Sequence, residues 1–431
     1  MSHITQDLAA RAAAGHPITV AVVGAGQMGR GLVSSLETIR GMQAAMVIDV
    51  EAERAINALT RAGVPREQIK VSDGAEQAAR WLAEGLRVVA TDADHIPAQG
   101  IEAVVEATGV PEVGARVALD TIGRGQHIIL LNVETDVTVG RILKKLADMA
   151  GVVYSVSAGD EPGATVELVE FARTLGFTVV AAGKGKNNVL DPDATPDTVQ
   201  EEALRKHASP HMFCSFVDGT KTMVEMTAVS NATGLVPEMA GMRGMHLSVD
   251  DLAATFSTVA QGGVLTRTGV VDFVHGIAPG VFAVITSGNE EIREDMDYLK
   301  VGPGPNWTLY RPYHLANLET PHTIAKAVLY HDVCLAPGER PVAETVAVAK
   351  RDLQPGATID GLGGYSVRGL IMAYDEAASS GALPLGLAQN AQVVRPVAKG
   401  EVIRYADVEI HQGSLVAVLR RLQDSWLGGG K

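Results

Sequence analysis

Residues 18–29 read ITVAVVGAGQMG, an apolar run that ends in the pattern Gly-x-Gly-x-x-Gly. Residues 30–37 then have a helical composition, and a second β-branched run, 46–50, carries Asp49. Strand, glycine turn, helix, strand and acid in this order form the fingerprint of a dinucleotide-binding fold. A glycine-rich turn in another kind of α/β domain is the alternative, and the full context favours the fingerprint.

The residues of this turn have distinct roles in that interpretation. Gly24 permits the tight turn, Gly26 lets the backbone approach a pyrophosphate, and Gly29 allows the helix to pack closely on the strand. The helix N-terminus, which includes Gln27 and Met28, offers free N–H groups and a positive dipole end to the phosphates. We therefore expect the pyrophosphate of NAD or NADP to lie on this turn.

Two further strand ends are expected to contact the cofactor. Asp49 would accept hydrogen bonds from ribose hydroxyls, which favours NAD over NADP, although nearby Arg54 offers a partner for the 2′-phosphate of NADP. Thr108 and Gly109 follow the apolar run 101–107, at a strand end where cofactor contacts gather in such folds. A loop cap is the alternative role for this second segment.

Composition limits the classes of partner. The chain has 431 residues, enough for two to three domains, and a formal net charge of −14, which argues against nucleic acid or an anionic membrane as partner. Its only cysteines, Cys214 and Cys334, are far apart, and the N-terminus lacks a signal-peptide pattern. We expect a cytoplasmic protein with reduced thiols.

The order of predicted elements indicates three domains. Apolar strands alternate with helices over residues 1–157, which predicts a Rossmann domain with a doubly wound parallel sheet. Residues 158–335, which are richer in β-branched and aromatic residues between 264 and 317, are expected to form a second, α+β catalytic domain. Residues 336–431 contain two similar phrases, 348–359 and 395–410, each predicted as strand, glycine turn and strand. They resemble the SAF domain, a small β-rich β-clip; a generic small α/β tail is the alternative.

Carboxylates follow two predicted strands. After the strand 127–132, Asp136 is expected to cap the next helix, whereas Glu134 has no such local explanation and is a candidate catalytic group. Asp160 and Glu161 come after the strand 152–157. Asp160 either caps the next helix or acts catalytically, and the two adjacent carboxylates could together hold Mg²⁺ or Mn²⁺.

The phrase GKGKNN at residues 183–188 is predicted to be a donor-rich loop after the strand 177–182. Lys184, Lys186 and Asn187 would suit an anionic substrate or a developing oxyanion. A lysine that is desolvated beside another cation can have a lowered pKa and act as an acid or base. We take Lys184 as the proton donor to a carbonyl oxygen and Lys186 as an anion holder. A solvated hairpin loop is the alternative.

Two other clusters are candidates for substrate binding. Lys221 and Thr222 open a predicted helix, where N–H groups bind phosphate or carboxylate, with helix capping by Asp218 or Thr220 as the alternative. In the phrase YRPYH at 310–314, Arg311 could grip an anion and His314 could carry a proton. A structural role is the commoner one for a single histidine.

Taken together, these phrases resemble the homoserine-dehydrogenase-like oxidoreductases with a C-terminal SAF domain, and among them the 1-deoxy-D-xylulose 5-phosphate reductoisomerase-like enzymes. GKGKNN and YRPYH carry the resemblance more specifically than the glycine turn does. It implies an NADPH-dependent, divalent-cation-assisted reaction on a small phosphorylated ketose, in which the carbon skeleton rearranges and the aldehyde is then reduced. It also implies a homodimer. Relatives with other substrates leave the reaction itself open.

The sequence thus predicts an NAD(P)H-dependent oxidoreductase that acts on a small anionic carbonyl compound. A plain dehydrogenase of the homoserine type, without rearrangement, is the alternative among enzymes. A dinucleotide-sensing or scaffold protein is the alternative outside them.

Overall fold

The computed structural model describes residues 3–206 and 208–426, which divide into two compact units. The first comprises Met1–Asp160, Leu315–Ala336 and Leu422–Ser425, and the second is built mainly from Glu161–His314 and Pro337–Arg421. The chain therefore enters the second unit at residue 161, close to the expected boundary. Residues 315–336 return to the first unit, which differs from the expected division.

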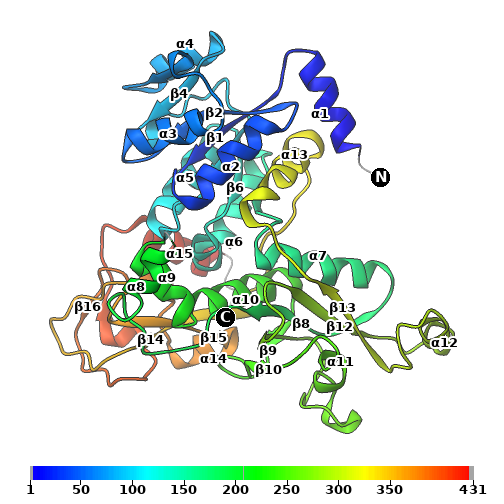
Figure 1. The fold of residues 1–431 in the computed structure, drawn as a ribbon. Coiled ribbons are helices and arrows are strands. Elements are labelled where there is room, and N and C mark those ends of the chain that lie inside the picture. Colours follow the sequence, from blue (N-terminus) through cyan, green and yellow to red (C-terminus); the bar gives the residue numbers. More distant parts are fainter. Residues whose placement is uncertain (1–2, 207, 427–431) are drawn as a thin grey trace. The chain divides into compact units, whose positions relative to one another are not determined.

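The first unit contains a seven-stranded sheet in the order β3-β4-β2-β1-β5-β6-β7 (Figure 1). Every pair in it is parallel, as predicted for a Rossmann domain. The strand order reverses between β1 and β5, which is where such folds bind their ligands. The strands are β1 (Ile18–Val23), β2 (Met42–Ile48), β3 (Ile69–Val71), β4 (Arg87–Ala90), β5 (Ala103–Glu106), β6 (His127–Leu130) and β7 (Tyr154–Val156).

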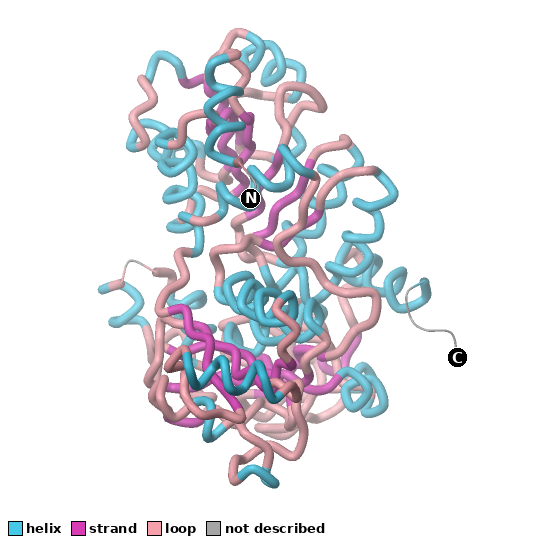
Figure 2. Tube along the Cα trace, turned by 90° about the vertical axis from the view of Figure 1, so that its right-hand side faces the viewer, coloured by secondary structure: helices cyan, strands magenta, loops and turns pink. Residues whose placement is uncertain are grey.

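Helices enclose this sheet, as the upper part of Figure 2 shows. The buried strand residues pack against apolar faces of α2, α3 and α13, because both faces of a parallel sheet must be covered. The three-residue β3 was not predicted, and α6 begins at Val133, before the start that was expected at Asp136. The helices are α1 (Ile4–Ala13), α2 (Gln27–Thr38), α3 (Ala52–Arg61), α4 (Ala75–Ala83), α5 (Pro111–Gly123), α6 (Val133–Ala150) and α13 (Thr320–Tyr330).

The second unit is built on a mixed sheet in the order β10-β11-β8-β12-β13, with β9 beside β11. Helices α7 (Glu161–Thr174) and α10 (Thr220–Thr233) lie on one face, and α11 (Leu252–Thr255) lies on the other (Figure 1). Each face has its own apolar core. The strands are β8 (Thr178–Lys186), β9 (Val236–Pro237), β10 (Met245–His246), β11 (Val270–His275), β12 (Val281–Thr286) and β13 (Asn306–Arg311).

Strand β8 includes most of the phrase that was predicted to be a loop. A Cβ on Gly183 would lie 1.7 Å from the carbonyl oxygen of Asp272, and one on Gly185 would lie 2.5 Å from the nitrogen of Ala278. The glycines are therefore needed because neighbouring backbone approaches the strand, not because the chain turns. With a period of two, Lys184 and Lys186 both face α7 and α10.

Residues 337–421 pack against α10 and belong to the second unit. The hydroxyls of Thr227 and Thr345 lie 2.8 Å apart, and the N–H of Gly369 donates to Thr220 Oγ1 over 2.8 Å. A separate third domain was expected here; the SAF fold itself stays a prediction. The elements after β13 are β14 (Ala343–Ala349), β15 (Val367–Ala373), α14 (Tyr374–Ser380), β16 (Gln392–Val393), β17 (Val408–Glu409) and α15 (Leu415–Trp426).

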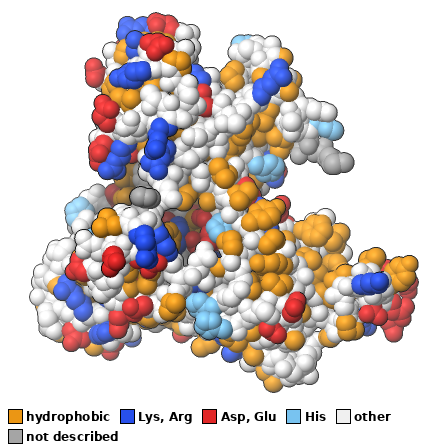
Figure 3. Space-filling view, in the orientation of Figure 1, with side chains coloured by type: hydrophobic (Ala, Val, Ile, Leu, Met, Phe, Trp, Pro, Cys, Tyr) orange, Lys and Arg blue, Asp and Glu red, His pale blue; other side chains and the backbone are white. Residues whose placement is uncertain are grey.

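The remaining helices of the second unit are α8 (Gln200–Arg205), α9 (Pro210–Val217) and α12 (Glu290–Tyr298). Basic and acidic side chains intermingle over much of the face in Figure 3, and acidic side chains gather where α12 lies. Among the described residues, no helix combines the length and the apolar character needed to cross a membrane.

Candidate functional site

The glycine turn of the first unit has the geometry that its sequence predicts. Gly24 has a φ of +97°, and a Cβ on Gly29 would lie 1.8 Å from the carbonyl oxygen of Gly24. A Cβ on Gly26 would meet nothing within 4 Å, and Gly26, Gln27 and Met28 are exposed at the start of α2. The turn therefore leaves open space in front of a helix N-terminus, which fits the pyrophosphate of a dinucleotide.

Asp49, the expected partner of the ribose, holds this turn through backbone hydrogen bonds. Its Oδ2 accepts the N–H of Ala25 over 2.8 Å, and its Oδ1 accepts the N–H of Glu51 over 3.0 Å. Each oxygen can accept a second hydrogen bond, so the ribose role stays a prediction. Arg54 forms an exposed ion pair with Glu51 at 2.6 Å, which leaves the choice between NAD and NADP open.

The end of β5 places Thr108 beside the glycine turn and buries a glutamate that sequence reasoning had passed over. A Cβ on Gly24 would lie 3.2 Å from the nitrogen of Thr108. The N–H of Thr108 donates to Glu106 Oε1 over 2.7 Å, and Oε2 is buried without a hydrogen-bond partner among the described residues. Burial raises the pKa of Glu106 to about 7, against hydrogen bonds that lower it. Gly109 follows, half-buried, with a φ of +71°.

The acids that follow β6 have different environments. Asn132 begins α6, because its Oδ1 accepts the N–H of Thr135 over 3.1 Å. The prediction that Asp136 caps this helix is wrong: Asp136 is buried and accepts the hydroxyl of Tyr154 over 2.7 Å. Burial raises its pKa to about 7. Glu134 is also buried, in the first turn, and its catalytic role stays a prediction.

In the second unit, Lys184 connects two helices through two carboxylates. Its ammonium donates to Glu161 Oε1, on α7, over 2.6 Å and to Glu225 Oε2, on α10. Lys184 and Glu225 are only 5% and 2% exposed. Burial lowers the pKa of Lys184, but the two carboxylates outweigh that effect and raise the pKa well above its ordinary value. Burial and the charge of Glu161 raise the pKa of Glu225.

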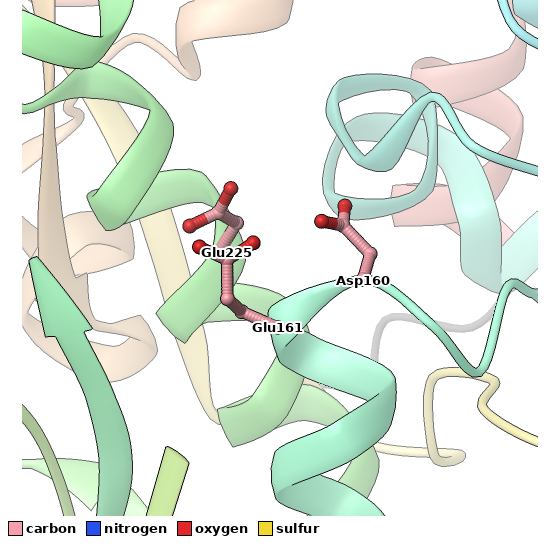
Figure 4. A group of neighbouring side chains, drawn as sticks. All are labelled: Asp160, Glu161 and Glu225. Atoms are coloured by element: carbon pink, nitrogen blue, oxygen red, sulfur yellow. The ribbon is translucent and has the colours of Figure 1, made fainter. Parts of the chain in front are cut away.

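Asp160 is bonded directly to Glu161, and the expected metal ligands are therefore part of this cluster. Asp160, Glu161 and Glu225 each present one carboxylate oxygen within 4.8 Å of the others (Figure 4). Hard oxygen donors of this kind suit Mg²⁺ or Mn²⁺. Because Lys184 already supplies one positive charge to Glu161 and Glu225, a cation would share these carboxylates with the ammonium.

Lys186 differs from Lys184 in its charge state. Its ammonium donates to the carbonyl oxygen of Phe216 over 2.5 Å, and the side chain is 5% exposed. Burial, followed by the charge of Lys184, lowers its pKa to about 8. The lowered pKa that the sequence suggested for this phrase therefore belongs to Lys186 and not to Lys184. Asn187 lies just beyond β8 and is exposed.

The start of α10 is fixed by a buried ion pair. Asp218 Oδ1 accepts the N–H of Thr220 over 2.9 Å, whereas Gly219 occupies the N-cap position itself. Its Oδ2 lies 2.6 Å from the ammonium of Lys350, in the C-terminal region. Lys221 and Thr222 follow in the first turn, half-buried and buried respectively. Their contact with a substrate anion stays a prediction.

His314 joins the Lys184 cluster, whereas Arg311 is engaged with another carboxylate. His314 Nδ1 lies 2.8 Å from the carbonyl oxygen of Pro279, and its Nε2 lies 3.5 Å from Glu161 Oε2. In the tautomer in which Nδ1 is protonated and donates to that carbonyl oxygen, Nε2 can exchange a proton beside Glu161. Arg311 pairs with Glu167 over 2.8 Å and stacks on the ring of Tyr313.

A comparison with family models matches residues 159–320 to the catalytic domain of oxidoreductase DRL. The matched stretch covers less than half of the chain, and it includes Lys184, Glu225 and His314. The middle of the chain is thus similar to an oxidoreductase catalytic domain. No curated protein sequence matches the chain.

Several solved structures resemble the chain at low identity and low TM-score. A probable dehydrogenase from Thermotoga maritima is 14% identical, with a TM-score of 0.42, over 75% of this chain and 92% of that one. The UDP-N-acetylglucosamine 3-dehydrogenase GnnA from Acidithiobacillus ferrooxidans is 13% identical, with a TM-score of 0.40, over 74% and 91%. A myo-inositol dehydrogenase from Corynebacterium glutamicum is 10% identical, with a TM-score of 0.41, over 73% and 89%. At these scores the likeness says nothing about the substrate.

Proposed function

We propose that this chain is an NAD(P)H-dependent oxidoreductase that reduces a carbonyl group of a small anionic substrate. The observation that carries the proposal is the buried Lys184, held between Glu161 and Glu225 within the stretch that matches an oxidoreductase catalytic domain. The glycine turn of the first unit supports a dinucleotide as the cofactor. In this proposal the first unit binds the cofactor and the second binds the substrate.

When bound, the nicotinamide supplies the hydride. Lys184 would direct an N–H at the carbonyl oxygen and stabilise the negative charge that develops on it. Although its two carboxylate partners raise the pKa of Lys184, the oxygen becomes a strongly basic alkoxide, to which Lys184 can pass a proton. His314, whose Nε2 lies 3.5 Å from Glu161, provides the route by which the cluster regains that proton.

We further propose that the substrate is a phosphorylated ketose and that its skeleton rearranges before reduction. The phrases GKGKNN and YRPYH and the oxidoreductase DRL match support this choice. Asp160 and Glu161 would hold Mg²⁺ or Mn²⁺, which polarises the oxygens of such a substrate when it is bound. The proposed enzyme is a cytoplasmic homodimer, which light scattering and cell fractionation can test.

The test is turnover with product analysis. The chain is incubated with NADPH or NADH, with and without Mg²⁺, and with 1-deoxy-D-xylulose 5-phosphate among a panel of phosphorylated ketoses. We expect cofactor oxidation and, by NMR, a branched product. An unbranched alcohol would indicate reduction without rearrangement and would favour a dehydrogenase of the homoserine type. Cofactor binding without turnover of any carbonyl compound would favour a sensor or scaffold protein and overturn the proposal.

A further inference from the structure

Three basic side chains stand in a row across adjacent strands of the second unit. Lys186, His275 and His246 are the last residues of β8, β11 and β10, and the sheet register pairs them directly. Both strand pairs are parallel, so the three side chains project from the same face of the sheet, the face that carries Lys184. The carboxyl ends of parallel strands are also where α/β proteins place their ligand sites.

The row leads from the interior to the solvent. Lys186 is 5% exposed, His275 is half-buried, and His246 is exposed. The two imidazole rings stack with centroids 4.5 Å apart and an angle of 19° between their planes. The row therefore runs from the exposed His246 to the buried Lys186.

The third feature of this row is its balance of charge. Among residues 3–206 and 208–426, none of its three members forms an ion pair with a carboxylate, and the Lys186 ammonium donates to the carbonyl oxygen of Phe216. Burial, His246 and Lys186 together lower the pKa of His275. An anion that binds beside the Lys186 ammonium and His275 would favour the cationic form of the imidazole, so the row favours an anion electrostatically.

We propose that Lys186, His275 and His246 bind the phosphate group of the substrate. Nothing in the sequence analysis gave the two histidines a role. Lys184 lies two residues before Lys186 on the same face, a separation of about 6.8 Å, which suits a phosphate a few bonds away from a carbonyl on Lys184. The identification of this phosphate as part of the substrate rests on the proposed function.

A phosphate fits this row better than the other ligands its chemistry suggests. The ammonium of Lys186 repels a metal ion, although imidazoles are common metal ligands. A dianionic phosphate can accept hydrogen bonds from all three members, whereas a carboxylate has fewer oxygens and a single charge. We therefore expect phosphate to bind more tightly than acetate.

The experiment measures binding of inorganic phosphate to the full chain by calorimetry at pH 7, without cofactor. Lys186→Met and His275→Gln should each raise the Kd for phosphate on the order of tenfold or more. His411→Gln changes an exposed histidine elsewhere in the same unit and should leave the Kd unchanged. Equal Kd values for all variants, absence of phosphate binding, or equal binding of acetate would overturn the inference.

A second measurement avoids dependence on the variants. In the wild-type chain with ¹³C-labelled histidine, saturating phosphate should raise the pKa of the His275 ring, as followed by NMR, and leave that of His411 in place. An unchanged His275 titration would contradict the inference. Because neither measurement uses cofactor or turnover, their failure would leave carbonyl reduction untouched, and failure of turnover would leave phosphate binding untouched.

Discussion

Replacing Lys350 by Met should destabilise the second unit and loosen the start of α10. The Lys350 ammonium lies 2.6 Å from Asp218 Oδ2 and donates to the carbonyl oxygens of Ala194 and Gly364 over 2.8 and 2.9 Å. The side chains of Lys350 and Asp218 are 2% and 0% exposed. Removing one partner of a buried pair costs about 3–5 kcal/mol, because the other charge is left buried. That is a large share of the ~5–15 kcal/mol by which proteins are stable.

The matched control is Lys399→Met. Lys399 pairs with Asp193 over 2.8 Å, but both side chains are more than half exposed, so its loss should cost at most about 1 kcal/mol. Urea unfolding of each variant is followed by circular dichroism, with hydrogen exchange read out separately over α10 because the chain has two units. Adding Asp218→Asn to Lys350→Met should recover part of the loss. If Lys350→Met costs no more than Lys399→Met, the ion pair does not fix α10.

Lys184→Met should lower kcat on the order of a hundredfold or more while leaving dinucleotide binding intact, as stopped-flow fluorescence can show; unchanged turnover would remove Lys184 from the mechanism. Gly29→Ala places a Cβ 1.8 Å from the carbonyl oxygen of Gly24 and should weaken NADH binding on the order of tenfold, whereas Gly123→Ala, where a Cβ meets nothing within 4 Å, should not. Since burial lowers the pKa of Lys186 to about 8, KM for a phosphorylated substrate should stay low below that pH and rise above it as the ammonium loses its proton. The kcat should not change over this range, because the carboxylates raise the pKa of Lys184 and keep it protonated. A KM that is flat from about pH 7 to 9.5 would contradict this assignment.

The parts of the fold that were predictable are those whose causes are local in sequence. The turn at 24–29 is specified by neighbouring residues, and it forms as predicted. The predicted strand ended before Gly183, whereas β8 continues through it. The need for this glycine arises from the backbone of Asp272, which is distant in the chain. A glycine that permits close approach and a glycine that permits a turn look alike in a sequence.

The sequence predicts which types of residue form the candidate site better than it predicts their contacts and protonation states. Lys184 and Glu161 were expected to be functional, but nothing local reveals that Glu225 completes their cluster or that Lys186 carries the lowered pKa. The row of Lys186, His275 and His246 arises from strand register, which single-sequence patterns do not specify.

The most direct test of carbonyl reduction at the Lys184 cluster is transfer of deuterium. NADPH or NADH labelled with deuterium at the nicotinamide C4 is incubated with the full chain and the phosphorylated ketoses, and the products are analysed by mass spectrometry. The account predicts one product that carries the deuterium on carbon, formed by the wild-type chain and strongly reduced in Lys184→Met. Cofactor binding with no labelled product from any carbonyl compound, or equal labelling by Lys184→Met, would contradict it.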